Sequence, residues 1–310
     1  MAKVNQAQSL RDTPDELIVA SIQPAGYLVA TDLKCEKIAA ASSNLAELLG
    51  MDVETALGAK SALIFDNEDL HEIRNALGHA SARSTRIPLS VKSISDRDYQ
   101  VLIHRHDDHA VIELVRERTK SRKRAAMLRL AYSYFDTKLE PHGLFGFFSE
   151  VVEHMRATLD FHRVGVVQCQ KGRLSETMAE ARYPGIDPRK PRSDRDGPRI
   201  PSEVRAIADQ TDQGLNVFGE VPINLDRALL ASPNTTEVHA MEHSGMKATF
   251  TAPIRIDGTT WGAILCESTD ARAFDPTLVA TLDLASKIVS QRVQHVLELE
   301  ELGPPEGERS

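Results

Sequence analysis

Histidine and carboxylate side chains make up the groups in this sequence that come closest to a metal-binding pattern. The run HRHDDH at 104–109 contains three histidines, two of which are spaced to share one face of a strand. His239 and His243 lie four residues apart with Glu242 between them, a spacing that can hold a metal ion on a helix. Neither group has the further ligands of a zinc site. We therefore interpret the first as a hairpin with solvent-facing histidines, the second as the surface of a helix, and predict no metal.

The sequence also lacks the common motifs of enzymes. It contains no P-loop, no GxGxxG after a strand, no GxSxG and no HExxH. Cys35, Cys169 and Cys266 are far apart and form no CxxC pair, which disfavours disulfides and zinc and favours a cytoplasmic location. We therefore predict that the chain is not an enzyme.

The composition indicates a globular protein of two ordinary domains. The chain has 310 residues, of which 41% are hydrophobic and 26% are charged, and its net charge is −8. Because a basic footprint is missing, we expect no nucleic-acid partner. No run of about 18 apolar residues is present, so we expect no membrane partner either. The basic run at 116–124 is then the solvated start of a connecting helix.

Residues 248–268 form the element around which the rest of the chain can be arranged. Alternate residues from Phe250 to Ile256 are apolar, which is typical of a strand with one buried face. Asp257-Gly258 is a turn signal, and 261–266 is an almost wholly apolar second strand. The pattern predicts a central β-hairpin in a sheet that helices cover.

The preceding residues predict short strands, small helices and then an antiparallel run, which is the order of a PAS domain. Strands are expected at 17–22, 27–30, 38–42, 87–91, 99–104 and 110–115, and helices at 44–49 and 68–78. In the second half, we expect a long amphipathic helix at 144–161, a strand from Arg163, a short helix at 200–209 and a last helix at 276–302.

Several motifs resemble the PAS–GAF photosensory module of bacterial phytochromes. SIQPAGYLVATD at 21–32 is similar to the opening of the family's PAS domain, and HRHDDHAVIELV at 104–115 to the strand pair that closes it. IPSEVR at 200–205 and the hairpin API-x-IDG-x-x-WG-x-x-x-C at 252–266 resemble parts of its GAF domain. The order of these pieces extends the resemblance over about 17–297.

The resemblance implies an α+β fold of two domains, PAS then GAF. Each has a central antiparallel sheet flanked by helices, and a phytochrome-type N-terminal knot joins them. The expected ranges are a flexible arm at 1–16, the PAS domain at 17–118, a linker helix at 119–139, the GAF domain at 140–297, and a helix end and disordered tail at 298–310.

The family uses this module to hold a linear tetrapyrrole, and the resemblance assigns its binding positions one at a time. Residues 1–21 contain no cysteine for attachment. The family's pyrrole-binding Asp, its Tyr, two propionate-binding Arg, a pocket His, an aromatic residue and a second His fall in turn on Arg199, Ala208, Gly214, Ala231, Glu237, Ala240 and Ser268. A gap of one or two residues could return His239 to the histidine's role, but it could not restore the others.

These replacements oppose bilin binding. Glu237 at ~4 Å from a propionate would oppose it by ~4 kcal/mol at an effective dielectric constant of about 20. Arg199 offers only donors to pyrrole N–H groups, which need acceptors. We therefore expect no bilin cofactor, with biliverdin as the alternative. The small replaced side chains are compatible both with a filled pocket and with a pocket for another ligand.

The resemblance implies a sensory or regulatory module of signal transduction that has lost bilin binding. The first alternative is a bilin-binding red/far-red photoreceptor, and the second is a structural dimerisation module without a ligand. An output domain or a partner protein would carry the signal.

An apolar stripe on the last helix, 276–302, favours a homodimer through helices. Burial of this stripe within one chain is the open alternative. Its members are Leu278, Leu282, Ala285, Val289, Val293, Val296 and Leu299.

Overall fold

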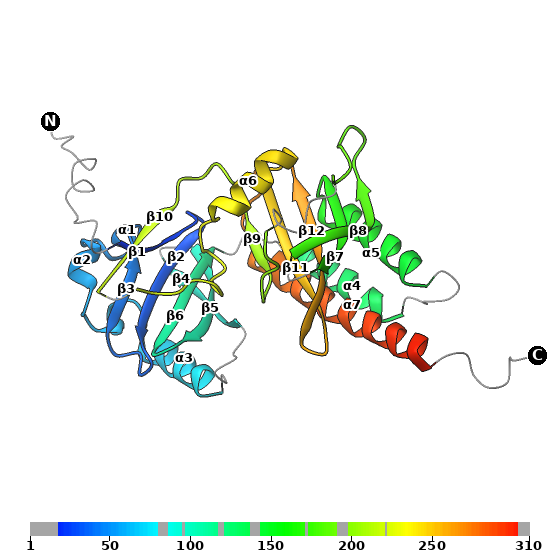
Figure 1. Cartoon of the computed structure of the whole chain (residues 1–310). Coiled ribbons are helices and arrows are strands. Elements are labelled where there is room, and N and C mark those ends of the chain that lie inside the picture. The colour runs from blue at the N-terminus through cyan, green and yellow to red at the C-terminus, as the bar shows by residue number, and fades with distance from the viewer. Residues whose placement is uncertain are drawn as a thin grey trace, which may run out of the picture. The chain divides into compact units, whose positions relative to one another are not determined.

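The computed structural model describes residues 18–79, 86–94, 97–116, 121–136, 143–170, 173–190, 198–220 and 222–302. The predicted arm at 1–16, the knot that depends on it and most of the predicted tail lie outside these ranges. The described chain forms two compact units (Figure 1). The first runs to Val115 and also includes Gln213–Ser232, and the second includes Arg116–Asp212 and the residues from Pro233 onward.

A single sheet forms the centre of the first unit. Its described strands follow the order β1-β10-β3-β2-β6-β5-β4. Their bounds are β1 Ile18–Ile22, β2 Gly26–Asp32, β3 Ile38–Ser42, β4 Ile87–Ile94, β5 Arg97–His106, β6 His109–Arg116 and β10 Leu215–Gly219. β10 is distant in sequence, yet it pairs antiparallel with both β1 and β3. The predicted GAF range of 140–297 thus includes a strand that belongs to the first sheet.

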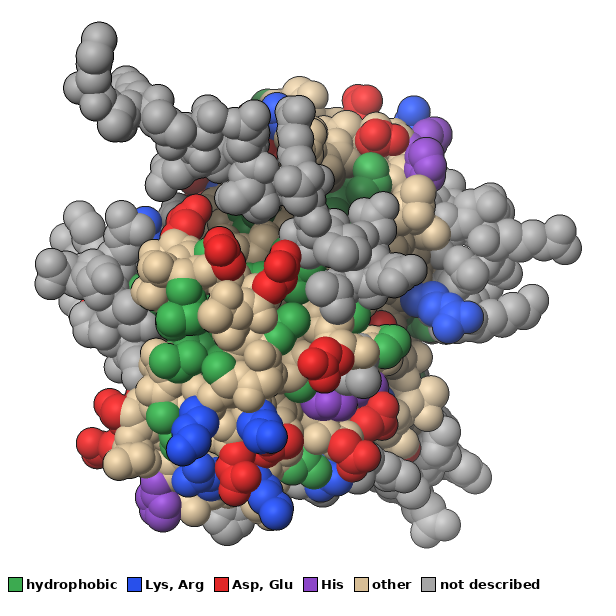
Figure 2. All heavy atoms as spheres, turned by 90° about the vertical axis from the view of Figure 1, so that its left-hand side faces the viewer, with side chains coloured by type: hydrophobic (Ala, Val, Ile, Leu, Met, Phe, Trp, Pro, Cys, Tyr) green, Lys and Arg blue, Asp and Glu red, His purple; other side chains and the backbone are tan. Residues whose placement is uncertain are grey.

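Short helices complete the first unit: α1 Leu45–Leu49, α2 Val53–Ala56, the 3₁₀ turn η3 Ser61–Leu63 and α3 Asn67–His79. Leu70, Ile73 and Leu77 recur at three- and four-residue steps on α3, and all three are buried in the same core cluster as the sheet residues. Gly50 ends α1 with φ 67°, as expected for a glycine after a helix. Figure 2 shows acidic and basic side chains interspersed over one face, with apolar side chains in small groups.

The second unit is a five-stranded sheet in its described part, with the order β8-β7-β12-β11-β9. The strands are β7 Arg163–Gln170, β8 Arg173–Arg182, β9 Arg205–Ile207, β11 Ala248–Ile256 and β12 Thr259–Ser268. The helices α4 Ser121–Asp136, α5 Gly143–Leu159 and α7 Pro276–Leu302 pack together, with α7 on β11 and α5 on β7 and β8 (Figure 1). α6, Thr235–Ser244, is shorter and separate from these three.

The predicted hairpin at 248–268 is confirmed. β11 and β12 pair antiparallel along almost their whole length, and Asp257 and Gly258 turn the chain with φ of 49° and 74°. Positive φ at both central residues is the geometry that a two-residue hairpin turn needs. The α+β expectation, two antiparallel sheets with helices, is likewise confirmed.

Two local predictions were wrong. The predicted helix at 200–209 instead contains β9, whose Ile207 pairs with Thr249 of β11. Pairing with a distant strand outweighed the local helical pattern. The second error concerns HRHDDH: the turn lies at Asp107, with φ 47°, but His104 is fully buried rather than exposed to solvent.

The apolar stripe of α7 is buried inside the second unit. Each member with a described side chain, from Leu278 to Val296, is at most 9% exposed. The alternative of intramolecular burial therefore describes this stripe. The homodimer itself stays a prediction, and it would need another surface.

Candidate functional site

The second unit contains a cavity on one face of its sheet. Residues of β8, β9, β11, β12 and α6 line it, together with Arg189, Pro198, Arg199 and Pro201, and its volume is about 50 Å³. Thr249 and Thr251 of β11 lie opposite Glu267 and Leu265 of β12. These four side chains line the cavity because alternate residues of a strand point to the same face.

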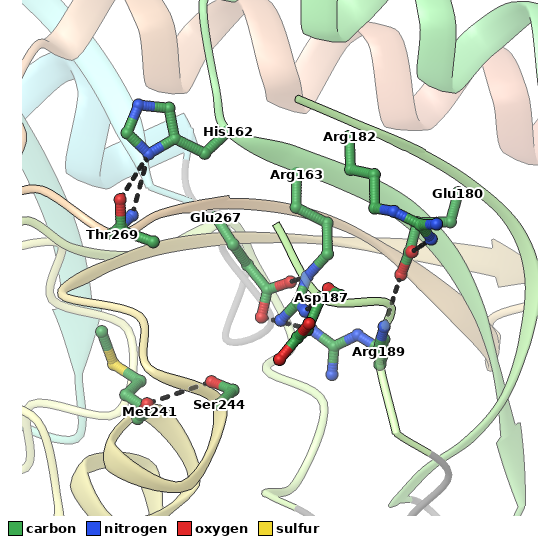
Figure 3. A network of polar contacts seen from close by, with 10 residues as sticks. All are labelled: His162, Arg163, Glu180, Arg182, Asp187, Arg189, Met241, Ser244, Glu267 and Thr269. Atoms are coloured by element: carbon green, nitrogen blue, oxygen red, sulfur yellow. Dashed lines mark hydrogen bonds and ion pairs between the residues drawn. The ribbon is translucent and has the colours of Figure 1, made fainter. Parts of the chain in front are cut away.

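A buried carboxylate lies at one end of the cavity, held by two arginines (Figure 3). Glu267 is 4% exposed, and its Oε2 accepts a hydrogen bond of 2.7 Å from Nε of Arg163 on β7. Its other oxygen accepts from Nη2 of Arg189. Burial alone would raise the pKa of Glu267, but the guanidiniums of Arg189 and Arg163 outweigh it and lower the pKa. The carboxylate is therefore ionised and doubly paired at neutral pH.

A second ion pair lies across the cavity, between β9 and α6. Arg205 donates from Nε and Nη2 to the two carboxylate oxygens of Glu237, at 3.0 and 3.1 Å. Glu237 also accepts from the backbone N–H of Asn234, whose side chain accepts from the backbone N–H of Glu237. This capping box starts α6, so one glutamate both begins the helix and joins it to the sheet.

The structure brings together three of the residues that the resemblance assigned to the bilin pocket. Arg199, Glu237 and Ala240 all line the cavity. Ala208 and Ser268 are buried in the second unit, but they are not among the described lining residues.

The remaining two assigned positions belong to the first unit. A side chain at Gly214 would collide with the hydroxyls of Ser21 and Ser232. Ala231 forms a bridge with Ile22. Neither position is part of the cavity in the second unit.

Sequence reasoning missed the charged groups that dominate the site. It assigned Ser268, whereas the neighbouring Glu267 lines the cavity. Because alternate residues of a strand point to opposite faces, only one of Ser268 and Glu267 can face the cavity, but the sequence does not show which one unless the pairing of the strands is known. Arg163, Arg189 and Arg205 were missed because no motif distinguishes a buried arginine from a surface one. The apolar stretch that follows Arg163 was the available signal, since the next four residues of β7 are buried.

The arrangement suits recognition of polar or charged groups more than catalysis. Two of the three arginines that line the cavity, Arg189 and Arg205, are paired with glutamates, and Thr249 Oγ1 is buried with no hydrogen-bond partner among the described residues. In the described part of the chain, no group of three histidine, cysteine or acidic side chains is placed to hold a metal ion. None of the described helices combines the length and apolarity needed to cross a membrane.

Comparison with known families and structures agrees with this architecture. Residues 17–116 match the PAS fold, and residues 146–293 match the GAF domain. The chromophore-binding domain of the unusual bacteriophytochrome RpBphP3 from R. palustris is similar, with a TM-score of 0.76 and 22% identity over 93% of this chain and 98% of that one.

Two other structures are similar at the same level. For the wild-type chromophore-binding domain of Stigmatella aurantiaca phytochrome P1, the TM-score is 0.73 and the identity 21%, over 89% of this chain and 96% of that one. For a longer RpBphP3 structure from R. palustris, the TM-score is 0.73 and the identity 22%, over 92% of this chain and 60% of that one. The chain therefore consists of a PAS domain followed by a GAF domain and has the fold of the chromophore-binding domain of bacteriophytochromes.

Proposed function

We propose that this phytochrome-like PAS–GAF chain is a sensory or regulatory module of signal transduction that has lost bilin binding. One observation supports this most strongly: the position that the resemblance assigns to a pocket histidine holds Glu237, whose carboxylate is already paired with Arg205. A histidine, which could donate to a propionate, is thus replaced by a carboxylate, which competes with the propionate for the same arginine.

The charges and the size of the cavity both oppose a bilin. A linear tetrapyrrole brings two carboxylates, which need arginine or histidine donors. Arg205 and Arg189 already donate to Glu237 and Glu267. A cavity of about 50 Å³ has room for only a few waters, at about 10–15 Å³ each. A bilin would therefore have to open both ion-pair networks.

A functional photoreceptor that binds biliverdin, without covalent attachment or through an atypical link, is the second candidate. The fold shared with chromophore-binding domains favours it. In either case we propose that an output domain or a partner protein carries the signal and that the module has no enzymatic activity of its own. The pairing of Arg189 and Arg205 with glutamates supports this absence of catalysis.

Co-expression with a haem oxygenase separates the two candidates. The purified chain should be colourless and should show no zinc-induced fluorescence on a denaturing gel. The matched positive control is the R. palustris chromophore-binding domain, produced in the same cells. A red or far-red absorption band in this chain would replace the first proposal with the photoreceptor.

A further inference from the structure

A second recess in the GAF domain shares Arg189 and Ser244 with the cavity described above. Its polar and charged lining consists of Arg163, Asp187, Arg189, Lys190, His243 and Ser244, and its volume is about 50 Å³. At about 10–15 Å³ for each water-sized position, three to five such positions fit. This is the space of a small ion or of the end group of a larger molecule.

Arg163 supplies the main evidence that the recess is a binding site. The residue is only 2% exposed, although it carries a full charge. Its Nε binds Glu267, and its Nη1 donates to the backbone carbonyl of Asp187 at 2.9 Å. Its Nη2 is buried and has no hydrogen-bond partner within the described structure. A buried guanidinium N–H without an acceptor is unfavourable, so the geometry calls for an acceptor at this position.

The charge around the recess indicates what this acceptor is. Two guanidiniums share the single carboxylate of Glu267 (Figure 3), and Lys190 adds a third cation at an exposed position. Opposing them is the exposed carboxylate of Asp187, and the C-terminal end of α6, with His243 and Ser244, adds a weak negative dipole. Three cations thus accompany two carboxylates here, since the nearby carboxylate of Glu180, which accepts from the backbone N–H of Arg189, is itself paired with Arg182. A water could accept from Nη2, but it would leave the excess positive charge uncompensated.

We propose that this recess binds a small oxyanion, meaning a phosphate, sulfate or carboxylate group. Nη2 of Arg163 and the guanidinium of Arg189 donate to it, because planar guanidiniums fit the geometry of oxyanions, and Lys190 adds charge at the entrance. The oxyanion is a free ion or the end group of a small molecule. This inference names the ligand class of the proposed sensory module and rests on that proposal.

The test measures anion binding by the whole chain with inorganic phosphate, sulfate and acetate, using calorimetry and melting temperature. Chloride at the same ionic strength is the reference. At least one oxyanion should bind saturably, and a hundredfold excess over its dissociation constant should raise the melting temperature by roughly 5–10 °C. Tighter binding of phosphate than of acetate would indicate a tetrahedral group, and the reverse a carboxylate. No saturable binding of any of the three would overturn the proposal.

Variants localise the binding. Arg163→Lys keeps the charge but removes Nη2, and should weaken binding at least about tenfold. Lys190→Ala changes an exposed side chain, should leave the fold intact, and should weaken binding about threefold. Lys247→Ala, also exposed and in the same domain, is the control and should bind as the wild type does. Unchanged binding in both test variants would contradict this site. Uptake of biliverdin would instead contradict the proposed function, whatever the anions do.

Discussion

Individual charged side chains determine what the GAF cavity can hold. Arg205 and Glu237 are 14% and 17% exposed in their side chains and form two parallel hydrogen bonds, so water screens the pair only partly. Arg182 and Glu180 form a single hydrogen bond in the same domain, and their side chains are 44% and 11% exposed. The two pairs therefore differ in the number of hydrogen bonds and in the exposure of the arginine.

A double-mutant cycle tests this difference. Arg205→Ala and Glu237→Ala should show a coupling free energy of about 1–2 kcal/mol in chemical denaturation. The control cycle on Arg182 and Glu180 should give less than about 0.5 kcal/mol. Glu237→Ala alone should also lower the free energy of unfolding by about 0.5–1.5 kcal/mol, because it removes the hydrogen bond that the Glu237 side chain accepts from the backbone N–H of Asn234, one half of the capping box. Equal coupling in both cycles would show that the cavity pair is no stronger than a surface contact.

The buried His104 of β5 gives the PAS domain a dependence on pH. Its Nδ1 lies 3.9 Å from Oε1 of Glu113. Burial, followed by the nearby guanidiniums of Arg86 and Arg227, lowers the pKa of His104 from 6.5 to about 3. The unfolded chain therefore takes up a proton here below about pH 6.5, whereas the folded chain does so only near pH 3. The stability that the neutral histidine contributes is complete above pH 6.5 and falls as the pH drops toward 3.

His104→Gln should remove this dependence. As the pH falls from 6.5 to 5, the free energy of unfolding should drop by up to about 2 kcal/mol more in the wild type than in the variant, at ~1.4 kcal/mol per pH unit. Hydrogen exchange of β5 and β6 amides at several pH values would measure it. His239→Gln, at a 75% exposed side chain, is the matched control and should behave as the wild type does. The same pH profile in His104→Gln and wild type would contradict the assignment.

For individual residues, the sequence indicated some that lie at the cavity, but not the contacts that they make there. Arg199, Glu237 and Ala240 line one cavity of the GAF domain, whereas the other four assigned positions are not among its described lining residues. The partners of Glu237 and the role of Glu267 could not be predicted, because both depend on which strand lies beside which. The burial of His104 has the same cause: Arg105 and His106 follow it directly, and only the completed sheet covers it.

Among the elements, β10 shows how a distant segment completes a domain. It inserts between β1 and β3, and Phe218 on it is buried in the core cluster of the PAS domain. Gly219 lies so close to β3 that a side chain would meet Cβ of Ala40 at 2.8 Å. The PAS sheet therefore needs residues from within the range expected for the GAF domain.

Phe218→Ala should destabilise the PAS domain by about 3–5 kcal/mol, because it leaves a cavity among side chains that cannot close up fully. Hydrogen exchange should speed up in β1 and β3, while β7 and β12 of the GAF domain keep their protection. Asn216→Ala, an exposed position on the same strand, should change stability by less than about 0.5 kcal/mol. Protection unchanged in β1 and β3 would mean that β10 is dispensable for this sheet.

Elements with a strong periodic pattern were predictable, and those held by pairing alone were not. In the hairpin 248–268 the residues from Phe250 to Ile256 alternate and 261–266 are almost wholly apolar, and the strand 38–42 is a short, mostly apolar run. β9 is only three residues long and exists through its register with β11, so its local sequence resembled a helix. Local pattern cannot reveal a partner that lies about 40 residues further along the chain.

For the whole molecule, the burial of the α7 stripe means that these residues stabilise the fold and do not form a dimer interface. Leu282 is fully buried within the GAF domain. Leu282→Ala should therefore lower the unfolding free energy by about 2–5 kcal/mol and leave the sedimentation behaviour of the folded protein unchanged. Gln291→Ala, exposed on the same helix, is the control for stability. A dimer that dissociates on Leu282→Ala without loss of stability would instead make the stripe an interface.

Titration of the purified chain with biliverdin shows directly whether the paired GAF cavity accepts a bilin. Absorption in the red and far-red is recorded during the titration and again after red illumination, with the R. palustris chromophore-binding domain as the positive control. We expect the spectrum of free biliverdin alone, with no bound band and no light-induced change. A saturable bound band, and above all one that red light converts, would contradict it.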